Sequence, residues 1–242
     1  HYDPFSDINT YWLSWGGENG RRFIEESGAL VDQNPVRPNT FWDEVHIEKD
    51  SIFDRLGQVD TDLPTITRDH YFWNSVNSGS TKELSFWLAD PFRGSSENVQ
   101  ISIGMHGLTY SETSTAAHTI FAFLNDNSIG EANWVQQEEY TLVSPAALNL
   151  SHNILADGDN ILATFIPAST EPGNYDRIVI NWIELGYEHL LKAQGDALRF
   201  RKSYINPSTN LEYEINGFST HDLVLYKEGL SRITGYSIRE NW

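Results

Sequence analysis

The chain of 242 residues contains no cysteine and only one methionine. Without cysteine, these residues can form no disulfide, no thiolate-bound structural zinc site and no cysteine nucleophile. Basic residues are also scarce: 16 Lys and Arg stand against 34 Asp and Glu, a formal net charge of −18 at pH 7. Nucleic acids and anionic membranes both require a basic surface, so we expect neither as a partner.

Long apolar runs are missing as well. No segment approaches the roughly 20 apolar residues of a membrane-spanning helix, so we expect no membrane span. The chain opens with His1-Tyr2-Asp3-Pro4 in place of an initiator Met, and we expect a processed or excised product of a secreted or cell-surface protein. An apolar content of 39% is enough for a sizeable core at this length.

Alternation of apolar and polar residues dominates the sequence, and helical periodicity is nearly absent, which predicts an all-β fold. Clusters of Gly, Pro, Asn and Asp separate the predicted strands, as they do in sandwiches. The clearest strands are residues 11–15, 43–49, 84–88, 98–106, 119–124, 140–143, 160–166, 177–185, 197–200, 211–215 and 222–226. Residues 44–55 and 143–151 are also open to interpretation as short helices, the second with Ser144 as its N-cap.

We therefore predict an antiparallel, jelly-roll-like β-sandwich over residues 1–196 and a small C-terminal β extension over 197–242. Trp87 and Trp182 lie inside apolar strands and are expected to be buried. The predicted core consists of Phe86, Leu88, Ile101, Ile103, Phe121, Phe123, Ile161, Leu162, Phe165, Ile178, Ile180, Trp182 and Leu185.

Several segments share an order of tight turns and aromatic strands: Tyr11–Gly16, Glu48–Asp50, His118–Asn125, Asp157–Leu162 and Asn181–Tyr187. In this order and spacing, they resemble the β-sandwich region that precedes the catalytic domain of bacterial gingipain-like cysteine peptidases. The resemblance covers most of the chain, from about Asp3 to Tyr226.

This resemblance implies a larger protein whose peptidase domain uses a His and Cys pair. Because the present chain has no Cys, we carry over no catalytic residue. We expect a non-catalytic accessory domain whose extension leads towards a catalytic domain of the same parent chain. Its partners would be that domain or another protein surface; whether the parent is an active peptidase is left open.

A carbohydrate-binding sandwich is the main alternative, because an exposed aromatic ring can stack on the apolar face of a sugar. The tryptophans that lie beside predicted loops are the candidates: Trp12, Trp15, Trp42, Trp73 and Trp134.

Two further hypotheses rest on carboxylates. One face of a predicted strand would carry Glu44, His46, Glu48 and Asp50. The acid and the nucleophile of a β-jelly-roll glycosidase can share a strand face in this way, so a glycosidase that uses Glu48 and Asp50 is the third functional hypothesis. An acidic surface also offers oxygen ligands to calcium, for which Asp157, Asp159 and Asn160 are the candidate site, although a plain β-turn explains the same residues.

Overall fold

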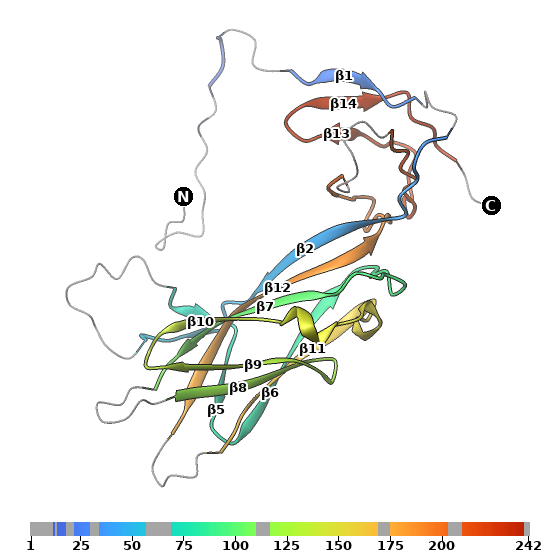
Figure 1. Ribbon diagram of the computed structural model, residues 1–242. Helices are drawn as coiled ribbons and strands as arrows, with labels where there is room; N and C mark the ends of the chain where they lie inside the picture. The colour runs from blue at the N-terminus through green and yellow to red at the C-terminus, as the bar shows by residue number, and fades with distance from the viewer. Residues whose placement is uncertain are drawn as a thin grey trace.

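The computed structural model describes residues 12, 14–17, 22–29, 34–56, 69–109, 117–168, 175–202 and 210–239. Strands make up nearly all of its regular structure, as Figure 1 shows. Within the described residues, no helix has the length and apolar character needed to cross a membrane.

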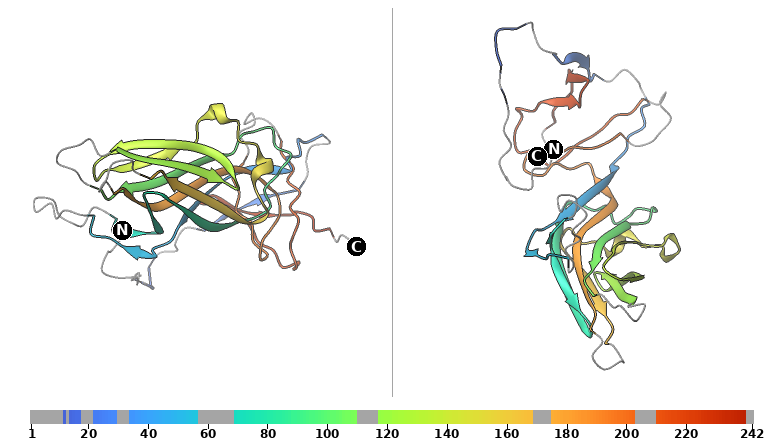
Figure 2. Two further views of the ribbon diagram at one scale, coloured as in Figure 1. Left: turned by 90° about the horizontal axis from the view of Figure 1, so that it is seen from below. Right: turned by 90° about the vertical axis from the view of Figure 1, so that its left-hand side faces the viewer.

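The main body is a sandwich of two sheets, seen edge-on in Figure 2. The first sheet has the order β10-β7-β12-β2, and β5 adds to it by pairing with β12. Its strands are β10 (Glu139–Val143), β7 (Gln100–Gly107), β12 (Arg177–Leu190), β2 (Thr40–Glu48) and β5 (Asn74–Asn77). The second sheet has the order β6-β11-β8-β9. Its strands are β6 (Ser80–Leu88), β11 (Gly158–Ile166), β8 (Ala117–Leu124) and β9 (Asn127–Val135).

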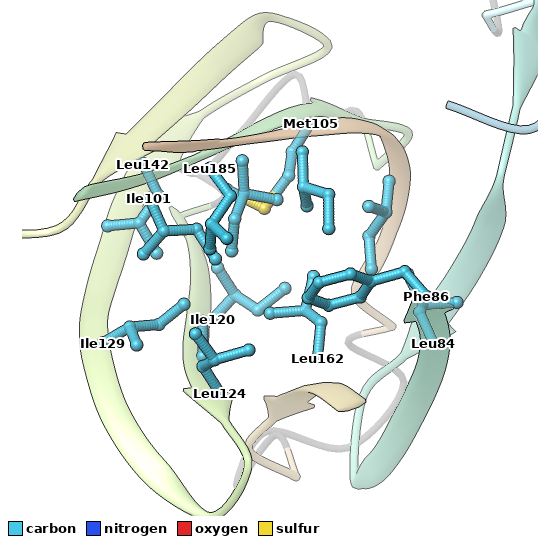
Figure 3. Packing of buried hydrophobic residues seen from close by; sticks show 14 of the residues in the cluster. Leu84, Phe86, Ile101, Met105, Ile120, Leu124, Ile129, Leu142, Leu162 and Leu185 are labelled. Carbon is cyan, nitrogen blue, oxygen red and sulfur yellow. The ribbon is translucent and has the colours of Figure 1, made fainter. Parts of the chain in front are cut away.

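All strand pairs within the two sheets are antiparallel. The interleaving of early and late strands in both sheets is that of a double-sheet jelly roll, so the predicted fold class is confirmed. The core lies between the sheets, where side chains such as Ile101, Ile120, Leu162 and Leu185 meet (Figure 3).

Alternation along each strand decides which predicted core residues reach this space. On β6, Phe86 and Leu88 point inward, which leaves Trp87 pointing outward with 57% of its surface exposed, so its predicted burial is wrong. On β11, Leu162 is fully buried whereas Ile161 is exposed. Phe121, Phe123 and Phe165 likewise lie on the outer side and are only partly buried. The other predicted core residues are buried, except Trp182.

Turn chemistry matches the sequence at the β8–β9 hairpin. Its two-residue loop, Asn125-Asp126, has positive φ at both positions (46° and 66°), which suits the primed turn that Asn and Asp tolerate.

Residues 44–55 form no helix, because β2 and the short strand β3 (Ile52–Phe53) occupy them. Within 143–151 only a 3₁₀ turn forms, η2 (Ala146–Leu148), while Ser144 Oγ accepts a hydrogen bond from the Ile101 amide. A second 3₁₀ turn, η3 (His152–Ile154), follows.

Two small sheets complete the fold. β3 pairs with β4 (Tyr71–Phe72), and together they help to cover Val179 on the outer side of β12. The other small sheet has the order β1-β14-β13, built from β1 (Ile24–Ser27), β14 (Ser231–Thr234) and β13 (Leu225–Lys227).

The β1-β14-β13 sheet lies beyond the ends of β2 and β12 (Figure 1). β1, whose residues fall within the range predicted for the sandwich, runs parallel to β14 in this small sheet. Residues 197–200 and 211–215 carry only isolated bridges and no strand. Of predicted strand 11–15, residues 11 and 13 lie outside the described residues.

Candidate functional site

Two tryptophans lie on the outer side of the first sheet, each packed against a glycine. The ring of Trp182 crosses from β12 onto Gly104 of β7, where an added methyl group would overlap it. The ring of Trp42 crosses from β2 onto Gly186 of β12, where an added Cβ would lie 2.6 Å from its Cζ2 atom. Both rings therefore rest on backbone, with no side chain between ring and sheet. We call this surface, with the polar residues between the rings, the indole face.

A β-bulge turns Trp182 towards this face. Ile178 and Ile180 point into the core, and simple alternation would send residue 182 there too. The register of β12 against β7 shifts between Ile180 and Trp182, after which Ile183 points inward instead. Bulges re-aim side chains in this way, and Trp182 becomes half-buried on the outer surface. The predicted burial of Trp182 in the core is therefore wrong.

An imidazole flanked by two carboxylates lies beside Trp182. Nδ1 of His46 is 3.2 Å from Oε1 of Glu184, and its Nε2 is 3.2 Å from Oε2 of Glu48. The His46 ring lies 5.6 Å from the Trp182 ring, centroid to centroid. As predicted, one face of β2 carries Glu44, His46 and Glu48. Val45 and Ile47 pack against the core on the other face.

The glycosidase hypothesis needs a second carboxylate from this face. Asp50 follows the end of β2, which stops at Glu48, so it is not part of the alternating strand. Glu184 of β12 stands across from His46 instead. Sequence reasoning did not select Glu184, since a residue on a distant strand becomes a neighbour only through the pairing of β12 with β2.

The outer side of the second sheet has a different character. It presents Phe121, Phe123, Phe165, Ile161 and Trp87, which we call the phenyl face. The rings of Phe121 and Phe165 are cross-strand neighbours with centroids 6.3 Å apart.

Carboxylates border the phenyl face. Glu83, Glu131 and Asp159 are exposed at its margins. The outward positions on the described strands of this sheet include no Lys or Arg. The phenyl face is therefore apolar at its centre and acidic at its edge.

The five predicted carbohydrate-binding tryptophans have different positions. Trp12 and Trp15 are 95% and 89% exposed. Trp42 belongs to the indole face. Trp73 and Trp134 are buried, at 4% and 7% exposure, so they have no free ring face for a ligand and must be corrected to core residues. Trp134 stacks on Tyr140, and its indole N–H donates to the Glu138 carbonyl.

The predicted calcium residues are engaged in local structure. Asn160 is fully buried, and its Oδ1 accepts hydrogen bonds from the Ala156 amide and from Asn125 Nδ2. Oδ1 of Asp157 accepts one from the Asp90 amide. Asn160 is therefore a turn-fixing residue, and the described residues contain no group of three His, Asp or Glu side chains placed to hold a metal. Calcium binding through Asp157 and Asp159 remains a prediction.

A buried imidazole and carboxylate pair lies at the opposite end of the sandwich from Trp42. Nδ1 of His118 is 2.5 Å from Oδ1 of Asp176, and its Nε2 is 2.8 Å from the Gln136 carbonyl oxygen. Both ring nitrogens thus face acceptors, and His118 is 1% exposed. The pair fixes the segments around Gln136 and Asp176 to β8, and solvent does not reach the ring.

A hollow of about 370 Å³ lies against β14 and the segments on either side of it, and none of its lining residues is a predicted site residue. Its walls include Leu223, Arg232, Tyr236 and Ile238. The Tyr236 hydroxyl donates to the Leu223 carbonyl, which closes one side of it.

No family model matches the chain, and no curated protein matches it. Among solved structures, dimeric latent PorU from Porphyromonas gingivalis is similar at a TM-score of 0.50 and 11% identity; the match covers 79% of this chain and 17% of the PorU chain. The carbohydrate-binding module CBM36 in complex with calcium and xylotriose is similar at a TM-score of 0.33 and 11% identity, covering 58% of this chain and 98% of that one. The CBM36-1 domain of a multidomain xylanase from the hindgut metagenome of Trinervitermes trinervoides is similar at a TM-score of 0.34 and 7% identity. That match covers 60% of this chain and 97% of the CBM36-1 chain. The PorU similarity shows a shared fold, within a much longer protein.

Proposed function

We propose that this chain is a non-catalytic, extracellular β-sandwich module that packs against a neighbouring folded domain, the role expected of an accessory region in a gingipain-like peptidase. One observation carries the proposal: the two central strands of the second sheet, β8 and β11, carry large apolar side chains on both of their sides. The inner side of this sheet forms the core, and its outer side is the phenyl face.

Antiparallel sheets with one solvated face normally alternate apolar and polar residues. β8 and β11 depart from that pattern. Ile120 and Leu124 fill the core while Phe121 and Phe123 point away from it, and Leu162 is buried between the outward Ile161 and Ala163. Continuous apolar runs of this kind are typical of strands covered on both sides, and large exposed apolar patches mark contact surfaces.

The charge around the phenyl face describes the partner. Because Glu83, Glu131 and Asp159 border it, a complementary surface would be apolar at its centre and basic at its edge. The fold similarity to a section of PorU supports the same proposal, since it shows that a sandwich of this kind occurs within a longer chain.

Footprinting with hydroxyl radicals tests the contact directly. Trp87 and Phe121 would be probed in this chain alone and in the intact protein isolated from its source. We expect their modification to fall several-fold in the intact protein, while Trp42, on the opposite sheet, changes less. Equal modification of Trp87 in both samples would refute packing through the phenyl face.

A turnover assay tests the non-catalytic part of the proposal. Incubation with peptide and aryl-glycoside substrates should release no product above the buffer rate. Hydrolysis that is lost in Glu48→Gln would show instead that the carboxylates of β2 are catalytic.

A further inference from the structure

We infer that the indole face is a second binding surface, which takes a neutral saccharide chain laid across the rings of Trp42 and Trp182. This inference is independent of the proposed packing through the phenyl face, since the two surfaces lie on opposite sides of the sandwich.

The two rings are fixed as platforms. Each packs against a glycine, so backbone supports it on the sheet side, while His46 lies beside Trp182 and His152 beside Trp42. Both rings are only partly buried, and we assign the surface that remains exposed to the ligand. Aromatic side chains in this position present a flat apolar surface at little cost in conformational entropy, which is what the C–H face of a sugar ring requires. Both tryptophans are half-buried, in contrast to the freely exposed Trp12 and Trp15.

The distance between the two tryptophan sites suits an oligosaccharide or polysaccharide and not a single sugar. The two glycine seats, Gly104 and Gly186, are four residues apart in the register of β12, since Gly104 pairs with Trp182. At about 3.3 Å per strand residue, the two glycines are offset by about 13 Å along the strand direction, which is the length of a few sugar rings.

Polar groups fill the interval between the seats. Gln100 and Ser102 of β7 and Glu184 of β12 point outward there, and Gln100 pairs with Gly186 while Ser102 pairs with Glu184. Amide, hydroxyl and carboxylate groups supply both donors and acceptors for sugar hydroxyls. Within the described chain, the indole N–H groups of Trp42 and Trp182 donate to no protein acceptor, so they are available as further donors.

Charge selects the class of saccharide. Glu44, Glu48 and Glu184 on this face would repel uronate or sulfate groups. A cationic ligand is disfavoured for another reason, because these carboxylates already have neighbours: His46 lies between Glu48 and Glu184, and Arg201 Nη1 is 3.8 Å from Glu44 Oε2. Their remaining lone pairs can still accept from neutral hydroxyls.

Affinity electrophoresis in native gels tests the inference with the chain as it stands. The gels would contain xylan, hydroxyethyl cellulose, laminarin or galactomannan as neutral probes, polygalacturonate as an anionic probe, or no polymer. Polylysine, titrated by isothermal calorimetry, is the cationic probe. We expect at least one neutral polymer to retard the wild-type chain.

Variants locate the binding. Trp182→Ala and Trp42→Ala should each weaken the retardation by about three- to tenfold, as expected for one lost stacking contact. Trp87→Ala removes an exposed tryptophan from the phenyl face and is the matched control, which should bind as wild type does. Glu184→Gln and Gln100→Ala change exposed polar groups without touching the core, so they test the same surface if a tryptophan variant fails to fold, as judged by circular dichroism.

The inference fails if no neutral polymer retards the chain, if only polygalacturonate or polylysine binds, or if Trp87→Ala weakens binding as much as Trp182→Ala does. Since Trp87 belongs to the phenyl face, the last result would move the saccharide site to that face. The other two results leave the proposed packing untouched, because footprinting of Trp87 tests that packing separately.

Discussion

The two outer faces of the sandwich differ although the same alternation produces both. On the indole face, large rings lie over glycines and polar side chains occupy the space between them. On the phenyl face, Phe121, Phe123 and Phe165 stand together with no outward Lys or Arg on the described strands. The first surface suits a hydrated ligand with many hydroxyls, and the second suits another protein's apolar surface.

This difference shows that strand alternation determines where a side chain points, whereas composition determines what the surface can do. In both sheets the inward residues are mostly apolar, with aliphatic side chains packed around a few rings such as Phe86 and Trp134. The outward residues, which contribute less to folding, carry the chemical distinction between the faces. Four measurements test this difference between the faces.

The largest effect is expected from the contrast between inward and outward neighbours on β11. Leu162→Ala should lower the free energy of unfolding by about 2–5 kcal/mol, because it removes fully buried methyl groups and leaves a cavity. Ile161→Ala, one residue away on the phenyl face, should cost about 1 kcal/mol or less. Urea unfolding followed by tryptophan fluorescence measures both. Equal losses would mean that the phenyl face is itself covered in the isolated chain.

The next effect concerns the seat of Trp182. Gly104→Ala should cost about 1–3 kcal/mol, because the new methyl group overlaps the indole ring and displaces it from the sheet. Near-ultraviolet circular dichroism should change with it. Gly17→Ala is the control, since no atom lies within 4 Å of the added carbon, and it should leave stability and spectrum unchanged. An unaltered Gly104→Ala spectrum would contradict the fixed platform.

A smaller, pH-dependent effect is expected where the edge of His152 meets Trp42. Burial lowers the pKa of His152, whose Nε2 accepts a hydrogen bond from the Glu188 amide at 2.8 Å. Protonation of Nε2 would abolish that bond and favours the unfolded chain. The stability linked to neutral His152 is therefore complete above the unfolded pKa of about 6.5 and is lost as the pH falls below it.

Midpoints of urea unfolding, measured between pH 7.5 and pH 5, test whether stability falls as the pH falls. The decline in wild type should be shallower in His152→Gln, which keeps a polar side chain without the titration. The comparison with the variant is needed because the chain contains other histidines, such as His118 beside Asp176, which the substitution leaves unchanged. A steeper decline in the variant would reverse the assignment.

The smallest effect is expected from the exposed charges of the indole face. Glu184→Gln should change the free energy of unfolding by less than about 1 kcal/mol, because its pairing with His46 is solvent-exposed and screened. Thermal melting detects this difference. A loss of several kcal/mol would show that Glu184 serves the fold, and its use as a binding probe would then be unsound.

The strands were the most predictable part of the molecule. The run Glu44-Val45-His46-Ile47-Glu48 alternates cleanly, and β2 follows it with Val45 and Ile47 towards the core. Where neighbouring residues are both apolar, as Ile161 and Leu162 are, the sequence predicts a strand but does not indicate which of the two side chains points inward. That choice depends on register with β6 and β8, which no local pattern contains.

The indole face was only partly predictable. Trp42 was identified as a candidate, but Trp182 shares the parity of Ile178 and Ile180 and was placed in the core with them. The bulge before Trp182 reverses that parity, and a single inserted residue leaves no periodic signal long enough to recognise. A small β extension was predicted over residues 197–242, where β13 and β14 lie, but the participation of β1 was not predicted. β1 comes from residues 24–27 and meets β14 across some two hundred residues of chain, so no local pattern links the two strands.

The parallel pairing of β1 with β14 has a mechanical consequence. β2 and β12 are antiparallel neighbours, and both connect to the small sheet from the same end. Tension on the two connecting segments would therefore separate β2 from β12 one residue pair at a time, starting at Thr40 and Leu190. β1 and β14 run parallel, and the same tension pulls them along their axes in opposite directions, loading the pairs from Ile24 with Ser231 to Ser27 with Thr234 together. Tension applied across the small sheet would therefore load its four β1–β14 residue pairs together before it reached the ladder between β2 and β12.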